Sequence, residues 1–149
     1  MSMYVTDLLI SSNSCNELKS LNLNEYQYLK SIEIGDDCFE NVNMFNIDGL
    51  NELNELKIGI NSFTHLKKGK WDANKANNSN RSFHILNCNE LESIEIGSYS
   101  FSDYGGEFEL KNLPKLSTIK IGQIGIDSSN FYSSSFVIKG SIDINIDNE

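Results

Sequence analysis

The heptapeptide LKSIEIG at residues 29–35 decides the fold of this chain, because the chain repeats it. It returns as LNELKIG at residues 53–59, LESIEIG at residues 91–97 and LSTIKIG at residues 116–122, at steps of 24, 38 and 25 residues. Such self-similarity is typical of a solenoid, in which each unit buries its apolar face only against its neighbours. The alternation Ile-x-Ile predicts a short strand with one buried face, and stacking of the copies predicts a parallel sheet.

Two columns of apolar residues accompany the heptapeptide. A Phe-x-Ile or Phe-x-Leu motif stands eight residues before the last three copies and begins one further unit later, and it predicts a second strand on the opposite side of each turn. A large apolar residue also follows each heptapeptide glycine by four residues. The first column contains Phe45, Phe83, Phe108 and Phe136, and the second contains Phe39, Phe63, Phe101 and Ile126. Phe131 is the only phenylalanine outside both columns, which we expect to fill the interior.

The length of 149 residues favours a single domain, 1–149, that is large enough to bury a core. We divide it into an irregular first turn over residues 1–28, repeats over residues 29–140 and a terminal strand over residues 141–149. The 38-residue step contains a hydrophilic, loop-like insertion over residues 64–82. These features predict a β-rich solenoid of about five turns with parallel, in-register strands and little regular helix.

The Leu-x-x-Ile-x-Ile pattern resembles leucine-rich repeats. A Cys/Leu-x-x-Leu segment leads into the pattern, and a Ser-Phe pair follows shortly after it. The pattern is most similar to the irregular BspA-type units, and the resemblance covers about residues 10–140. The chain departs from the common repeat where Gly35, Gly59, Gly97 and Gly122 replace the asparagine that follows the strand. The resemblance implies a curved, right-handed solenoid that is used mainly for protein recognition.

Composition and charge exclude several classes of protein. The formal net charge is −9 and the pI is about 4.6, which disfavours a surface for nucleic acid. No apolar stretch approaches the length of a membrane span. Cys15, Cys38 and Cys88 are odd in number and lack paired spacing, so we expect buried free thiols. The first residues lack the order of a signal peptide, so the cytoplasm is the default expectation, and an extracellular or cell-surface location is the alternative.

The insertion over residues 64–82 concentrates positive charge on an otherwise acidic chain. It contains five cationic side chains and one acidic side chain, so its own net charge is +4. Because the whole chain has a net charge of −9, the residues outside the insertion carry −13. Trp71 is the only tryptophan, and a tryptophan in an exposed basic loop is a typical recognition anchor. The predicted contact residues are Lys67, Lys68, Lys70, Trp71, Lys75 and Arg81. In the alternative, Trp71 folds back and pins the loop onto the solenoid. We expect the insertion to be dispensable for folding, because it contributes nothing to the core columns.

No group of residues predicts a reaction. His65 and His84 are the only histidines, and His84 is expected to be an exposed strand residue between the inward-facing Phe83 and Ile85. Cys88 follows four residues later, but its column faces the core, which argues against a Cys–His dyad. The acidic residues lack the spacing of a calcium loop, and no glycine motif suits a phosphate. We therefore expect no enzymatic activity, no catalytic residues, no cofactor and no metal.

One outward-facing column of the predicted main strand alternates in charge. It runs Glu33, Lys57, Glu95 and Lys120, so in-register stacking places each charge beside an opposite one. We interpret this charge ladder as a device that sets the register. A ligand surface is the weaker interpretation, because the column is small and neutralises itself.

These features predict a non-catalytic protein-recognition or scaffold module whose protein partner contacts the insertion. The alternative is a self-assembling structural protein, a homo-oligomer or filament stacked through the solenoid ends. Its assembly edge would be the alternating stretch that contains Ile142, Ile144 and Ile146. The last two of these residues fall 25 positions after Ile119 and Ile121, which predicts their register in the sheet.

Overall fold

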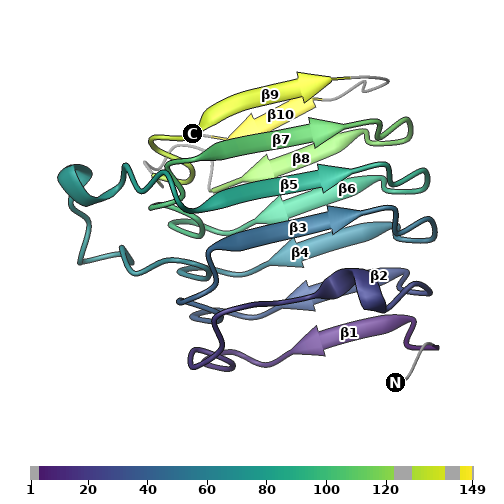
Figure 1. Cartoon of the computed structure of the whole chain (residues 1–149), viewed down its shortest axis with the longest axis horizontal. Helices are drawn as coiled ribbons and strands as arrows, with labels where there is room; N and C mark the ends of the chain where they lie inside the picture. The colour runs from purple at the N-terminus through teal and green to yellow at the C-terminus, as the bar shows by residue number, and fades with distance from the viewer. Residues whose placement is uncertain (1–3, 123–128, 140–144, 149) are drawn as a thin grey trace.

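The computed structural model describes residues 4–122, 129–139 and 145–148, which form parallel strands in two sheets (Figure 1). The major sheet contains, in spatial order, β1 (Asp7–Ile10), β2 (Ser31–Ile34), β4 (Glu55–Ile58), β6 (Ser93–Ile96), β8 (Thr118–Ile121) and β10 (Asn145–Asn148). The minor sheet contains β3 (Met44–Asp48), β5 (Ser82–Leu86), β7 (Glu107–Lys111) and β9 (Ser135–Lys139). The described helices are two 3-10 segments, η1 (Leu23–Glu25) and η2 (Ala73–Lys75). In these residues no helix is long and apolar enough to cross a bilayer.

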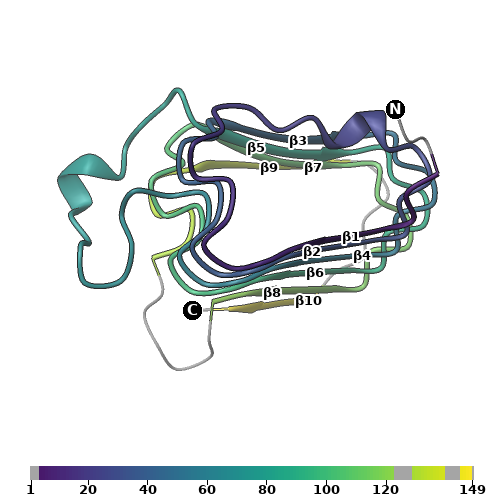
Figure 2. The ribbon, with the colours of Figure 1, turned by 90° about the horizontal axis from the view of Figure 1, so that it is seen from below.

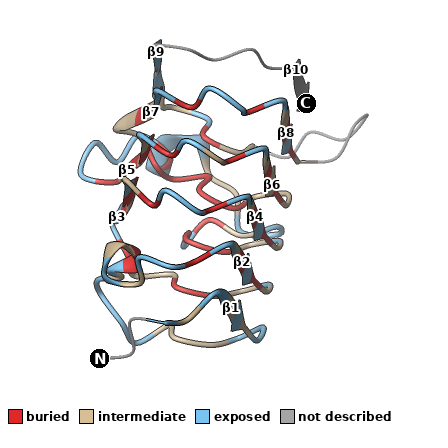
Figure 3. Cartoon of the chain, turned by 90° about the vertical axis from the view of Figure 1, so that its right-hand side faces the viewer, coloured by how far each residue is buried: buried red, intermediate tan, exposed pale blue. Residues whose placement is uncertain are grey.

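From β2 onward, successive strands alternate between the two sheets, and neither sheet closes on itself. The sheets form opposite walls of the molecule, and the chain crosses between them at both sides (Figure 2). Buried residues alternate with more exposed ones along the strands, and further buried residues lie in the turns that connect the two sheets (Figure 3). The prediction of a β-rich fold with parallel strands and little helix is confirmed.

The four heptapeptide copies lie side by side in the major sheet in the predicted register. Ile32 pairs with Leu56, Leu56 with Ile94, and Ile94 with Ile119. All four side chains are buried, and their neighbours along each strand point outward. This alternation fixes the register, because a slip of one residue would turn the whole apolar face into solvent.

The charge ladder has the predicted neighbours, since Lys57 is in register with Glu33 and with Glu95, which in turn faces Lys120. No ion pair within 4.0 Å joins these four described side chains. Exposed cross-strand charges of this kind contribute about 0.2–1 kcal/mol per pair. The role of the ladder in setting the register therefore stays a prediction, and the buried isoleucines carry the larger effect.

Phenylalanine rings form two stacked columns in the interior, with centroids 4.9 Å apart between Phe83 and Phe108 and 4.7 Å apart between Phe63 and Phe101. The prediction that Phe131 lies outside both columns is wrong, because Phe131 stacks on Phe101 with planes 9° apart. Ile126 itself lies outside the described residues. The spacing rule failed because Phe131 follows its glycine by nine residues, whereas earlier members follow theirs by four.

A ladder of hydrogen bonds fastens each turn to the one before it. The Ser62 hydroxyl donates to the Gly35 carbonyl at 2.8 Å, and the Ser100 hydroxyl donates to the Gly59 carbonyl at 2.6 Å. Equivalent bonds run from the Cys38 thiol to the Ser11 carbonyl and from the Asn130 amide to the Gly97 carbonyl. The serine of each Ser-Phe pair therefore satisfies a carbonyl that the turn would otherwise leave without a partner.

The heptapeptide glycines sit where successive turns approach each other closely. A Cβ atom at Gly97 would lie 2.6 Å from the backbone carbonyl carbon and oxygen of Gly59, closer than any side chain tolerates. After each of the five strands β1, β2, β4, β6 and β8, two non-glycine residues adopt left-handed backbone conformations with φ between 51° and 66°. They are Asn13, Asp37, Asn61, Tyr99 and Ser129, and two residues later Cys15, Phe39, Phe63, Phe101 and Phe131. Each costs about 1–2 kcal/mol, which burial of the phenylalanine rings offsets.

Residues 1–28, which the sequence predicts to be irregular, contain a regular strand. In β1, Leu8 pairs with Ile32 and Ile10 pairs with Ile34, which is one full step of 24 residues. The repeat is hidden in the sequence because Val5 stands where later copies have leucine and a serine stands where they have glycine.

The 3-10 helix η1 covers the first edge of the minor sheet. The Asn24 side chain accepts a hydrogen bond from the Asp48 backbone N–H at 2.9 Å and donates to the Asn46 carbonyl at 3.4 Å. These groups belong to β3, whose backbone would otherwise be open to another strand. The minor sheet is therefore capped at this end.

The terminal strand β10 pairs in parallel with β8, inside the predicted range 141–149. Its predicted register is wrong, because Ile146 lies opposite Ile119 where Ile144 was expected. The lengthened last unit displaces the pairing by two residues, from a separation of 25 to one of 27. Ile142 and Ile144 of the predicted assembly edge lie outside the described residues.

Candidate functional site

The insertion over residues 64–82 projects from one side of the two-sheet body (Figure 2). It contains η2, which Asp72 caps by accepting a hydrogen bond from the Asn74 backbone N–H at 2.9 Å. Lys68, Lys70 and Lys75 are exposed. These three predicted contact residues therefore present their charges to solvent.

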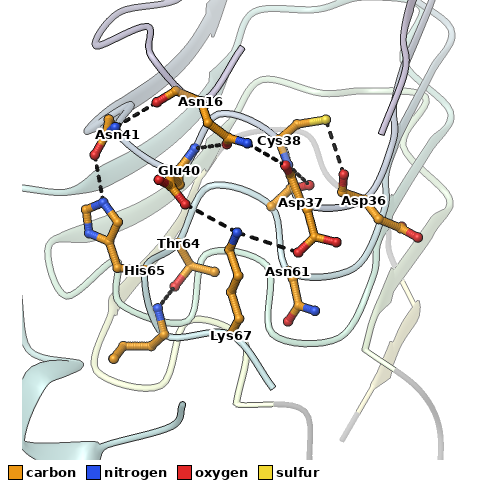
Figure 4. A network of polar contacts seen from close by, with 12 residues as sticks. Asn16, Asp36, Asp37, Cys38, Glu40, Asn41, Asn61, Thr64, His65 and Lys67 are labelled. Carbon is orange, nitrogen blue, oxygen red and sulfur yellow. Dashed lines mark hydrogen bonds and ion pairs between the residues drawn. The ribbon is translucent and has the colours of Figure 1, made fainter. Parts of the chain in front are cut away.

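Lys67 has a different environment, because it anchors the start of the insertion. Its Nζ lies 3.5 Å from Asp37 Oδ1 and 3.3 Å from Glu40 Oε1, two carboxylates of the preceding unit (Figure 4). The backbone N–H of Lys68 donates to Asn61 Oδ1 at 2.9 Å. Lys67 therefore attaches the loop to the body, and its charge is largely compensated there.

Further polar contacts in the same region join three successive turns. His65 Nε2 lies 2.7 Å from Asn41 Oδ1, and the Asn41 amide donates to the Asn16 carbonyl at 2.7 Å (Figure 4). The Asn16 amide in turn donates to the Asp37 carbonyl at 2.9 Å. This network makes the base of the insertion continuous with the body.

The prediction that Arg81 contacts a partner is wrong, because its side chain is only 1% exposed. Its guanidinium lies 2.9 Å from Asp103 Oδ2 and donates to the backbone carbonyls of Glu40 at 2.6 Å and Val42 at 3.0 Å. Arg81 Cζ also lies 5.0 Å from the centre of the Tyr104 ring. The end of the insertion is therefore buried against the turns of two other units, which its hydrophilic sequence did not indicate.

Arg81, Asp103 and Tyr104 form a buried ionic cluster. The backbone N–H of His65 donates to Asp103 Oδ2 at 3.2 Å, which adds a second partner to the buried carboxylate. Burial raises the pKa of Tyr104, so its hydroxyl stays protonated and donates to the Val42 carbonyl. The cluster connects the insertion to the interior of the protein.

Trp71 is partly buried, and its indole meets the exposed ring of Tyr132 edge to face, with centroids 5.1 Å apart. Ala76 is fully buried, and Asn78 forms an isolated parallel bridge with Tyr104. The insertion contributes no residue to the phenylalanine columns or to the main hydrophobic cluster, as expected, but it buries Ala76 beside them. Trp71 contacts the body, as in the alternative interpretation, and keeps part of its surface in solvent.

The outer face of the major sheet holds a shallow depression of about 360 Å³ beside the charge ladder. It is lined by the ladder residues and by the heptapeptide glycines Gly35, Gly59, Gly97 and Gly122. Side chains of both charges alternate along it, and it contains no aromatic side chain. It therefore offers little that would select a ligand.

One cluster of potential ligands was missed by the sequence interpretation. His84 Nδ1 on β5 lies 2.8 Å from Glu109 Oε1 and 3.7 Å from Glu107 Oε1, both on β7. The His84 side chain is 18% exposed, so the expectation of an open surface histidine is wrong. The pairing was readable in the sequence, because His84 and Glu109 hold the same position in motifs 25 residues apart and those motifs stack in register.

The three cysteines are free thiols. Cys38 and Cys88 are buried, as predicted, and Cys15 is partly buried. Burial raises the pKa of the Cys88 thiol and that of the Cys15 thiol. A raised pKa suppresses the thiolate, which is the nucleophilic form, so neither side chain is activated for covalent chemistry.

Comparisons of the chain with protein-family models, with curated proteins and with solved structures found no match.

Proposed function

We propose that the chain is a leucine-rich-repeat-like, right-handed solenoid of about five turns that acts as a non-catalytic protein-recognition module. The repeated heptapeptide, its in-register pairing and the stacked phenylalanine columns support the solenoid. The partner is an acidic protein surface, and the insertion over residues 64–82 is the contact. The observation that carries this proposal is an exposed cationic loop that is firmly attached to an acidic body.

The attachment makes the loop suitable for binding. Lys67 and Arg81 pair with carboxylates of the body at the two ends of the insertion, and Ala76 is buried between them. A loop that is already ordered loses less conformational entropy when a partner binds. Lys68, Lys70 and Lys75 then supply the charge that attracts an acidic surface, and Trp71 with Tyr132 supplies aromatic contact area.

Reversing the charge of the exposed loop lysines tests the proposal. We expect the triple variant Lys68→Glu, Lys70→Glu, Lys75→Glu to weaken binding of an acidic partner by at least about tenfold, because attraction becomes repulsion. Acidic peptides are first selected against the wild-type protein from a displayed library. Their affinity is then measured from the fluorescence of Trp71, the only tryptophan in the chain.

The matched control is Lys19→Glu, Lys30→Glu, Lys111→Glu, which changes the net charge equally at exposed sites outside the insertion. This control should bind the selected peptides as the wild type does. Equal weakening in both triple variants would show that only total charge matters. A selection that yields no binding peptide would remove the proposed partner class.

Self-assembly is a second candidate function, and the free end of the minor sheet favours it. Phe136 and Ile138 of β9 continue interior columns, yet they are 56% and 43% exposed because no described strand lies beyond them. The β3 end is closed by η1, so association through the minor sheet would join two β9 ends. Light scattering over a concentration series should then show a dimer that Phe136→Lys disrupts. A protein that remains monomeric throughout the series excludes this candidate.

A further inference from the structure

The outer face of the minor sheet carries a three-residue cluster that plays no part in the proposed recognition loop. His84 of β5 lies opposite Glu109 of β7, and Glu107 points from the same face of β7 two residues earlier. One potential ligand atom from each of the three lies within 4.8 Å of the others. We propose that His84, Glu107 and Glu109 form a binding site for a transition-metal dication, with Zn²⁺ as the preferred ion.

The distances between the ligand atoms suit a tetrahedral ion. Nitrogen and oxygen ligands lie about 2.0–2.1 Å from Zn²⁺, so two of them in a tetrahedral site are about 3.3 Å apart. His84 Nδ1 lies 2.8 Å from Glu109 Oε1 and 3.7 Å from Glu107 Oε1, on either side of this value. Shifts of about half an ångström in these side chains would admit Zn²⁺, and water would complete its coordination.

The charge of the cluster also favours a cation. Glu107 and Glu109 share one imidazole, and no lysine or arginine of the described chain lies within 4.0 Å of either carboxylate. The in-register neighbours on the flanking strands are neutral, Asn46 beside His84 and Val137 beside Glu109. Two carboxylates on one face of a strand repel each other, and a bound dication would neutralise both.

The ligand types select among dications. An imidazole nitrogen suits Zn²⁺ and its transition-metal neighbours, whereas Mg²⁺ and Ca²⁺ prefer sites built from oxygen atoms alone. The half-buried position of His84 and Glu109 holds these two side chains in place before the ion arrives. The preferred ion is therefore Zn²⁺, and Mg²⁺ and Ca²⁺ should not compete for the site.

Calorimetric titration of the chelator-treated protein with ZnCl₂ tests the site. We expect a single class of site in the wild type and an affinity at least about tenfold lower in His84→Ala and in Glu109→Gln. His65→Ala and Cys15→Ser should bind as the wild type does, because they remove the other histidine and the least buried thiol. An excess of Mg²⁺ or Ca²⁺ should not displace the ion.

A second measurement uses the unmodified protein, so it does not depend on the variants folding. In an NMR spectrum of the two histidine rings, Zn²⁺ should shift the signals of His84 and leave those of His65 in place. Absence of binding at about 1 mM free Zn²⁺ would overturn the proposal and leave the cluster as a cross-strand ion pair only. Shifts at His65, unaltered affinity in both ligand variants, or displacement by Mg²⁺ would also overturn it.

Discussion

Replacing Arg81 by methionine is expected to lower the free energy of unfolding by about 3–5 kcal/mol, because it leaves a buried carboxylate without its partner. Asp103 is buried, and its Oδ2 atom lies 2.9 Å from Arg81 Nη1. The substitution also removes the donors to the Glu40 and Val42 carbonyls, at 2.6 and 3.0 Å. Urea unfolding followed by circular dichroism would measure the loss.

Two further variants distinguish the effect of breaking a buried ion pair from the effect of removing a cationic side chain in general. Lys115→Met breaks an exposed pair of nearly the same length, 2.8 Å between Lys115 Nζ and Glu90 Oε1, and should cost less than about 1 kcal/mol. The double variant Arg81→Met, Asp103→Leu removes both buried charges and should recover much of the stability that Arg81→Met loses. If Arg81→Met costs no more than Lys115→Met, the buried ionic cluster does not stabilise the fold.

Replacing Phe101 by alanine is the second change with a large expected effect, a loss of about 3–5 kcal/mol. The Phe101 ring is fully buried and stacks between Phe63 at 4.7 Å and Phe131 at 5.1 Å. It also meets Phe83 and Tyr104 edge to face, at 5.0 and 4.8 Å. Its φ of 60° is as unfavourable for alanine as for phenylalanine, so the loss reports packing and not relief of backbone strain.

Phe136→Ala is the matched control for this substitution, because Phe136 belongs to a phenylalanine column but is 56% exposed at its end. Its truncation should cost about 1 kcal/mol. Thermal and urea unfolding of both variants would give the difference. Similar losses for the two variants would mean that the interior of the column contributes no more than its exposed end.

Spacing in the sequence could predict much of this fold because the strands stack in register. When each unit contacts only its neighbours, a residue lies beside the one that holds the same position in the adjacent unit. The pairing of Ile32, Leu56, Ile94 and Ile119 therefore followed from the heptapeptide alone. The same rule placed Glu109 beside His84, although the sequence interpretation applied it to polar residues of the main strand only.

Predictions failed where the length or composition of a unit changes. Val5 hides the first copy of the heptapeptide, so β1 was missed. The longer spacing before Phe131 concealed its place in the second column, and the longer last unit displaced the register of Ile146. A constant repeat length cannot predict where extra residues are inserted, because turns of different lengths can connect the same stacked strands.

The sequence by itself determined most of the parallel strands, the register of the four heptapeptide copies and most of the interior columns, because these depend on periodic burial. Only the tertiary structure decided how the insertion is used. It placed Lys67 between two carboxylates, buried Arg81 against Asp103 and left Lys68, Lys70 and Lys75 exposed. All five are cationic residues of one hydrophilic loop, and their sequence context is alike. Their different environments arise because burying a charge is favourable only where a specific partner from another unit compensates its desolvation.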